Sequence, residues 1–436
     1  MRGAHADQRG HAMSDQFDLL QTALAFSFAA GRAENVWGTN IALLDFFGMA
    51  LKDGGTYRII YKQTEPTADD VPSELQVTGF LHTVGPRLLG QDWEITWGPC
   101  IFADPSRTLS PNRITLANGM FVAHSHNANA YIVAISPTNF ASRYALRLMD
   151  EENAPENAVD FPVDLSGTVV PRAGNHTDRM QLTGGTGLGV FNLCQMFDPL
   201  HQGGIGPHLV SLRPKPDTKL IFAGHSLGGA LAPSLALQFR GLLTRWAPEN
   251  IMVLATAGAT PGNTKFTDEW NGKFLPKAVE SPSTENGLRD FNTLHWNTLD
   301  FVPYAFTNLH GLETAYWNKH DLVLGSKVVD CPLGHCTDDL NADENTASAV
   351  LQDYARLCRL SRLQNTPFTG NWPVNYWGRD GSRRTYPTPD GTIPGPGNTV
   401  SHEALLFAKQ RAHMEQYLAF AGIDPWDIPP PVSIPG

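Results

Sequence analysis

The residues around Ser226 carry the clearest signal for chemistry in this chain. They read Gly224-His225-Ser226-Leu227-Gly228, an apolar run enters them at 219–224, and an Ala- and Leu-rich stretch follows. Gly-x-Ser-x-Gly alone is a weak motif, but here it lies in the strand, sharp turn and helix that expose a nucleophilic serine. Larger side chains at the glycine positions would collide with the neighbouring strand and helix. We therefore predict that Ser226 is a nucleophile.

A serine nucleophile needs a base and an acid that orients the base, because its hydroxyl is unreactive at its ordinary pKa. In a strand–turn–helix site of this kind the acid and then the histidine follow the serine along the chain. Asp300 lies at the end of a run in which apolar and polar residues alternate, and Pro303 follows it. We therefore expect Asp300 to be the acid. Asp268 and Asp290 lie in polar stretches and fit this role less well.

The base must be chosen among the histidines that follow the acid. They are His310, His320, His335, His402 and His413. His413 lies near the end of the last helical pattern of the chain, and we predict that it is the base. His402 begins that pattern and could instead be a capping or surface residue, although spacing alone hardly separates the two.

Short apolar runs indicate the elements that position these residues. Runs at 119–124, 130–136, 219–224 and 251–257 are rich in β-branched or aromatic residues, which is typical of strands buried on both faces of a mostly parallel sheet. Helical patterns at 187–197 and 227–243 separate the later runs, so the sequence predicts a doubly wound α/β fold. Before them, 16–52 reads as helix broken near Gly31 and Gly38, and 53–118 alternates as strands do.

The rest of the chain reads as one domain with extensions. We expect a disordered extension at 1–15, a single domain at 16–425 and a Pro-rich tail at 426–436, with a loop-rich insertion at 305–400 between acid and base. Helical patterns appear at 346–363 and 401–421. Cys331 and Cys336 are close enough to bridge a loop, and with His335 they lack the paired spacing of zinc sites.

Composition excludes several classes of protein. The 436 residues contain 32 Lys and Arg against 43 Asp and Glu, a net charge of −11. No cationic cluster appears, which argues against a nucleic-acid partner. The apolar stretch at 19–30 is too short for a transmembrane span of ~20 residues, and Asp15 and Asp18 make it a poor signal peptide. Secretion and a cytoplasmic location both stay open. Dinucleotide and P-loop motifs are missing, so we expect no cofactor and no metal.

Several motifs together resemble the class 3, fungal-type lipases. They are Gly-His-Ser-Leu-Gly-Gly-Ala-Leu-Ala at 224–232, Ala-Gly-Ala-Thr-Pro-Gly-Asn at 257–263, Asp-Phe-Val-Pro at 300–303 and the late His413. The resemblance implies an α/β-hydrolase fold and a catalytic triad of Ser226, Asp300 and His413. It covers about residues 115–304 and 400–420.

The resemblance also implies an oxyanion hole. Its donors would be Leu227, just after the serine, and Thr138, because Tyr-Ile-Val-Ala-Ile-Ser-Pro-Thr-Asn at 131–139 matches the family in strand, position and threonine. Two positions depart from the family pattern: Pro137 stands where glycine is usual, and Ser136 where arginine is common.

The activity that the resemblance implies is carboxylic-ester hydrolysis, foremost by a triacylglycerol lipase acting on acylglycerols at an interface. A phospholipase A1, a membrane-attacking effector lipase, a short-chain or polyester esterase and a non-catalytic binding protein on the same fold are alternatives. Residues 140–149 and 190–200 are lid candidates, and both also read as amphipathic helices packed on the sheet. The first 110 residues and the 305–400 insertion have no counterpart and could frame the substrate pocket.

Overall fold

The computed structural model describes most of the chain up to residue 295 and short pieces beyond. The described residues are 16–105, 113–149, 157–279 apart from 175, 177, 202 and 260, then 288, 290–295, 302, 375–377, 383–385, 413, 414, 417, 418, 421–424 and 427–432. Several predictions fall outside them: the extension at 1–15, Asp300, His402, the 346–363 helix and the Cys331–Cys336 pair.

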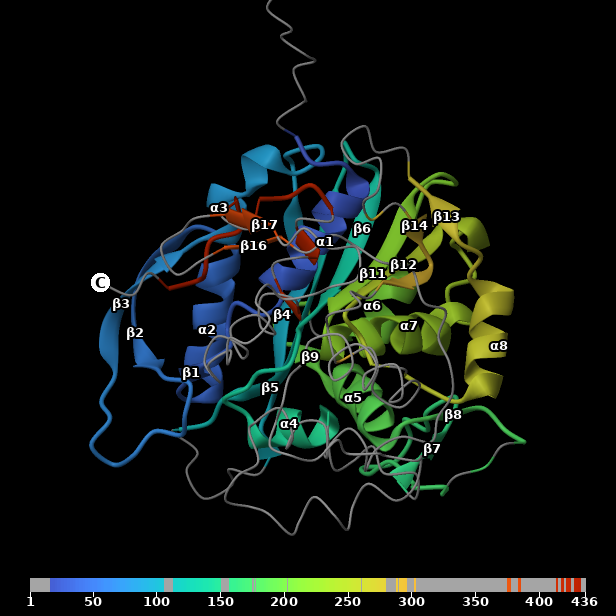
Figure 1. Cartoon of the computed structure of the whole chain (residues 1–436), viewed down its shortest axis with the longest axis horizontal. Helices are drawn as coiled ribbons and strands as arrows, with labels where there is room; N and C mark the ends of the chain where they lie inside the picture. Colours follow the sequence, from blue (N-terminus) through green and yellow to red (C-terminus); the bar gives the residue numbers. More distant parts are fainter. Residues whose placement is uncertain are drawn as a thin grey trace, which may run out of the picture.

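A six-stranded sheet forms the centre of the molecule (Figure 1), in the order β15-β12-β11-β6-β5-β4. Its strands are β4 (Glu94–Ala103), β5 (Leu116–Ser125), β6 (Ala130–Ile135), β11 (Lys219–His225), β12 (Ile251–Thr256) and β15 (Thr293–His295). The ladders from β6 through β11 and β12 to β15 are parallel. The predicted sheet, mostly parallel and flanked by helices, is confirmed.

One strand runs against the others. β5 is antiparallel to both β4 and β6, although every residue in it is buried like a parallel core strand. The physical reason is the short connection: residues 126–129 suffice for a hairpin, whereas a parallel crossover needs a dozen residues or more. Burial alone therefore did not reveal the direction of this strand.

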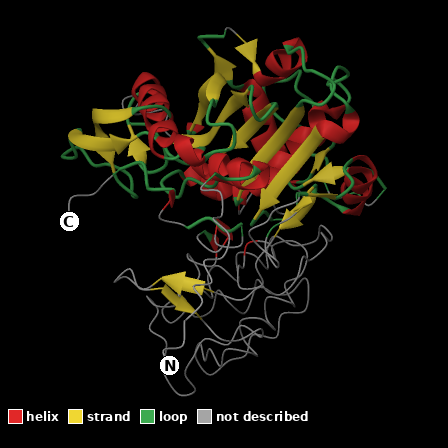
Figure 2. Cartoon of the chain, turned by 90° about the horizontal axis from the view of Figure 1, so that it is seen from above, coloured by secondary structure: helices red, strands yellow, loops and turns green. Residues whose placement is uncertain are grey.

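Two hydrophobic cores cover the two faces of the sheet. Alternate residues of a strand point to opposite faces, so Ile221 and Ala223 of β11 belong to one core, and Leu220 and Phe222 belong to the other. This double burial explains the nearly continuous apolar runs in the sequence. Figure 2 shows the helices packed around the strands.

The helices divide between the two cores. Helices α1 (Leu19–Ala29) and α2 (Asn40–Leu51) supply side chains to the first core, and α5 (Gly184–Gln195), α6 (Ile205–Ser211), α7 (Leu227–Arg240) and α8 (Thr264–Lys273) supply the second. Helix α4 (Arg143–Met149) packs beside α5. Within the described residues, no helix is both long and apolar enough to cross a membrane.

The region expected to be a broken helix holds two helices and a strand. Asp18 and Gln21 form a capping box that starts α1, and Thr39 caps α2. Between them the two-residue strand β1 (Val36–Trp37) joins a small sheet with β2 (Gly54–Tyr61) and β3 (Ser73–Thr78). The short helical turns α3 (Phe80–Thr83) and η1 (Gly85–Arg87) then lead into β4. The breaks near Gly31 and Gly38 are real, but the sequence did not indicate the strand between them.

Residues near the C-terminus return to these N-terminal elements. The Thr78 amide donates to the Pro431 carbonyl at 2.9 Å, and the Gln21 side chain donates to the Ala421 carbonyl at 2.7 Å. The Arg32 guanidinium donates to the Pro429 carbonyl at 2.7 Å. These contacts hold the C-terminal segment, which contains His413, against the body of the protein.

Short paired strands complete the described structure. The pairs are β7 (Val159–Asp160) with β8 (Gln181–Leu182), β9 (Phe197–Asp198) with β10 (Gly203–Gly204), β13 (Lys277–Ala278) with β14 (Asp290–Phe291), and β16 (Asn375–Trp377) with β17 (Arg383–Thr385). A 3-10 turn, η5 (Pro248–Asn250), precedes β12.

Candidate active site

Ser226 occupies a strained turn between β11, which ends at His225, and α7, which begins at Leu227. Its backbone angles are φ 57° and ψ −123°, a region that non-glycine residues rarely adopt and that is typical of functional sites. The Ser226 amide donates to the Thr256 carbonyl of β12 at 3.0 Å, and its carbonyl accepts from the Gly229 amide at 2.8 Å. These bonds hold the serine at the carboxyl edge of the parallel strands.

Glycines around the serine allow this turn to form. A Cβ added at Gly224 would overlap the Gly228 carbonyl, and one added at Gly229 would overlap the Thr256 carbonyl. At Gly228 an added Cβ would lie 2.6 Å from the Ile135 carbonyl oxygen, at the end of β6. The first turn of α7 is therefore in direct backbone contact with β6 and β12, as the spacing of the motif indicated.

The structure brings His413 to the serine. Its Nε2 lies 2.8 Å from the Ser226 Oγ although the two residues are 187 positions apart in the sequence. Both side chains are buried. The Ser226 hydroxyl can donate its proton to this nitrogen, which is the contact that a general base needs.

A second histidine, His225, supports the first. Its ring stacks on Phe28 of α1 at 4.6 Å, and lies 5.1 Å from the His413 ring and 5.3 Å from the Tyr417 ring. Burial, together with the neighbouring His413, lowers the pKa of His225 well below its usual value. The uncharged ring therefore packs under His413 without adding a competing positive charge.

Sequence reasoning did not assign a role to His225 or Phe28. The place of His225 immediately before Ser226 was the available signal for the first. Nothing in the sequence indicated Phe28, because it lies about 200 positions from the serine and arrives through the packing of α1 on β11.

The three acidic candidates have different surroundings. Asp300 lies outside the described residues, but β15 ends at His295, at the sheet edge that carries Ser226. Asp268 is exposed on α8, and Asp290 belongs to β14, where its backbone carbonyl pairs with the His295 ring at 2.7 Å.

Thr138 lies in the loop that follows β6. Its side chain is buried, and within the described residues its hydroxyl has no hydrogen-bond partner. A buried hydroxyl left without a partner costs about 1–3 kcal/mol and calls for an explanation such as a ligand. The loop is held by Asn139, whose amide donates to the Thr115 hydroxyl at 2.9 Å and the Leu116 carbonyl at 2.7 Å.

Two other residues lie near this loop, and the first of them is structural. Ser136, at the position where arginine is common in the family, accepts a hydrogen bond from the Gly119 amide at 2.7 Å. Leu227 supplies the first amide of α7, and the first amides of a helix have no partner within it. Because Gly228 touches the Ile135 carbonyl, the Leu227 amide and the loop after β6 meet at one corner of the sheet.

A buried carboxyl lies next to this corner. A Cβ added at Gly31 would touch the Glu34 carboxyl on one side and lie 3.1 Å from the Pro137 ring on the other. The Glu34 Oε1 is buried and has no hydrogen-bond partner among the described residues. Burial raises the pKa of Glu34 to about 8, so the group is mainly uncharged at pH 7.

The two lid candidates belong to packed elements. Residues 140–149 contain α4, with Ala145 and Leu148 buried, and residues 190–200 contain the end of α5 and strand β9. Both segments also expose large apolar side chains, of which Phe140 and Phe197 are each about 60% exposed.

The sheet, its flanking helices and the serine turn define an α/β hydrolase. Residues 200–306 match the family model described as Lipase (class 3). The class of activity is that of a lipase-type ester hydrolase.

Several solved structures similar to this chain are lipases. The M37 lipase is 18% identical, with 94% of this chain and 96% of that chain covered at a TM-score of 0.49. The lipase of Rhizopus microsporus var. chinensis is 17% identical, with 49% and 56% covered at 0.30. The triacylglyceride lipase of Rhizomucor miehei is 16% identical, with 49% and 61% covered at 0.31. Comparison with curated protein sequences finds no match.

Proposed function

We propose that this protein is a serine-dependent lipase that hydrolyses acylglycerol esters through an acyl-enzyme intermediate. The observation that carries the proposal is the 2.8 Å contact between the His413 Nε2 and the Ser226 Oγ. It occurs at a serine with positive φ between a strand and a helix, the turn that presents a nucleophile in α/β hydrolases.

In the first half of the reaction, His413 takes the proton of Ser226 while the serine oxygen attacks the ester carbonyl. Asp300 is proposed to hold the imidazole in the required tautomer and to stabilise its charged form. The protonated His413 then gives its proton to the leaving alcohol. The neutral state of His225 favours this step, because a second cation 5.1 Å from His413 would oppose its protonation.

The oxyanion of the tetrahedral intermediate would be stabilised by the Leu227 amide and by the amide and hydroxyl of Thr138. The buried hydroxyl of Thr138, which has no partner in the described part of the chain, supports this assignment, because a donor held ready before the substrate arrives needs no reorganisation during the reaction. Removal of one such donor typically lowers turnover by about 10²–10³. Water then hydrolyses the acyl-enzyme with His413 again as the base.

The test measures hydrolysis of p-nitrophenyl esters from acetate to palmitate, of emulsified triacylglycerol and of phospholipid vesicles. Ser226→Ala is expected to lose about 10⁴- to 10⁶-fold in turnover. Ser234→Ala is the matched control, because Ser234 is a buried serine of α7, the helix that follows Ser226, and its hydroxyl donates to the Ala230 carbonyl at 3.0 Å.

The substrate profile separates the alternatives. Long-chain and triacylglycerol activity that depends on Ser226 would support the proposal. Turnover of phospholipid alone would favour a phospholipase A1 or a membrane-attacking lipase, and turnover of short esters alone would favour an esterase. If wild type and Ser226→Ala hydrolyse every ester at the same rate, the serine mechanism is contradicted. If that rate is also no higher than the uncatalysed rate, the result favours a binding protein.

A further inference from the structure

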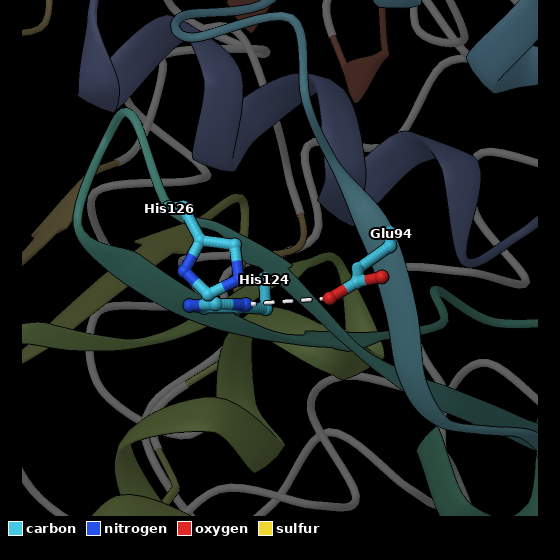
Figure 3. A group of neighbouring side chains, drawn as sticks. All are labelled: Glu94, His124 and His126. Atoms are coloured by element: carbon cyan, nitrogen blue, oxygen red, sulfur yellow. Dashed lines mark ion pairs between the residues drawn. The ribbon is translucent and has the colours of Figure 1, made fainter.

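Three side chains with metal-binding chemistry meet far from the serine. They are Glu94 on β4, His124 on β5 and His126 in the turn after β5 (Figure 3). One ligand atom from each lies within 4.8 Å of the others. Figure 3 shows the two imidazole rings close together with the Glu94 carboxylate facing them from the neighbouring strand.

The backbone dictates this meeting. Glu94 and His124 are paired directly across the β4–β5 ladder, and His126 begins the turn that follows β5. The His124 Nδ1 lies 3.6 Å from the Glu94 Oε1, and the two imidazole ring centroids are 4.4 Å apart.

The central ligand of the cluster is held by packing. The His124 side chain is only 10% exposed, and its ring stacks on Tyr131 at a centroid distance of 4.1 Å. Tyr131 in turn packs edge-on against Trp246 at 5.6 Å. The imidazole therefore has a defined orientation before any ion binds.

The turn that carries His126 is also fixed. Asp92 accepts hydrogen bonds from the Ser125 hydroxyl and, at 3.1 Å, from the Asn127 amide, so it clamps the residues on both sides of His126. In known metal sites, residues that hydrogen-bond around the ligands without touching the ion orient those ligands in the same way. Because the Asp92 oxygens are engaged in this way, Asp92 acts as a support and not as a ligand.

Two imidazole nitrogens and one carboxylate oxygen form a donor set that Zn²⁺ accepts, with water in the fourth position. Ligand bonds of about 2.0–2.2 Å place tetrahedral ligand atoms about 3.3–3.6 Å apart, and the His124–Glu94 pair already lies at 3.6 Å. We propose that Glu94, His124 and His126 bind one Zn²⁺ ion, which joins the edge strand β4 to the β5–β6 turn. Rotation of the exposed Glu94 and His126 side chains closes the remaining distance.

The site is separate from the proposed catalytic centre. Glu94, His124, Tyr131 and Leu220 form one row across the sheet. Ser226 follows Leu220 by six residues, or about 20 Å at 3.3 Å per residue. The ion would therefore stabilise the sheet edge and take no part in ester hydrolysis, so the inference does not depend on the proposed function.

The experiment measures Zn²⁺ binding to the full chain by calorimetry after treatment with a chelator, for wild type, Glu94→Gln and His126→Gln. Both substituted side chains are exposed, so the variants are expected to fold, which circular dichroism checks. His82→Gln, which replaces an exposed histidine on α3, is the matched control. Co²⁺ serves as a second probe because its visible absorption reports nitrogen and oxygen coordination.

We expect wild type and His82→Gln to bind one equivalent of Zn²⁺ with the same affinity. Both ligand variants should bind this Zn²⁺ at least about tenfold more weakly. The same equivalent should raise the melting temperature of wild type but not of His126→Gln. Zinc binding that is equal in wild type and both ligand variants would place the ion on other histidines or cysteines and overturn the proposal, as would no binding to wild type.

Discussion

Replacing Gly228 with alanine tests whether the contact between α7 and the loop after β6 sets the oxyanion geometry. The new Cβ would lie 2.6 Å from the Ile135 carbonyl oxygen and 2.8 Å from that of Ser136. Real Cβ atoms almost never approach closer than 3.0 Å, and ordinary contact begins at 3.4 Å. The first turn of α7 and the start of the loop must therefore separate by 0.4–0.8 Å.

This separation would displace the Leu227 amide from Thr138, the two proposed oxyanion donors. A misplacement of about 1 Å at a catalytic group can cost about 10² in rate, so we expect kcat to fall about 10- to 100-fold. KM should change little, because the contact acts on the transition state. Overpacking should lower the free energy of unfolding by about 1–3 kcal/mol.

The assay compares steady-state kinetics on a short p-nitrophenyl ester with thermal unfolding of the same samples. Gly48→Ala is the matched control, because a Cβ there meets nothing within 4 Å and Gly48 lies inside α2. That variant should keep its kcat and gain about 0.5–1 kcal/mol in stability. A folded Gly228→Ala variant with wild-type kcat would refute the proposed link between this contact and the oxyanion hole.

Two further substitutions test the buried groups near the same corner. Thr138→Val should lower kcat by about 10²–10³, because it removes a proposed oxyanion donor. The melting temperature should stay unchanged or rise, because the lost hydroxyl has no partner among the described residues. A kcat equal to that of wild type in kinetic assays would exclude the hydroxyl as a donor. Glu34→Gln should gain stability over wild type as pH rises from about 4.5 to 8, because the folded state keeps a proton on Glu34 that the unfolded state releases. The gain in the free energy of unfolding is at most about 5 kcal/mol. Urea unfolding at pH 5, 7 and 9 measures it, and a difference between the two proteins that is the same at all three pH values would contradict the prediction.

Local patterns were enough to predict the serine turn and the elements around it. The apolar run before Ser226, the glycines beside it and the helix after it are consecutive in the chain, and each reports on its immediate surroundings. Burial on both faces also appears locally as an uninterrupted apolar run, so the buried strands were found. Strand direction did not appear in the composition of β5, because the shortness of the turn after it, and not its burial, made that strand antiparallel.

By itself, the sequence determined the type of turn at Ser226, the presence of buried strands and the order in which the proposed acid and base follow the serine. Tertiary structure alone decided which distant side chains meet. His413 reaches Ser226 across 187 positions, Phe28 comes beneath His225 from the first helix, and Glu94 meets His124 and His126 through strand pairing. The reason is physical: propensity and hydrophobic periodicity are set by neighbours in the chain, whereas these contacts exist only once burial of apolar surface has offset the entropy of closing long loops.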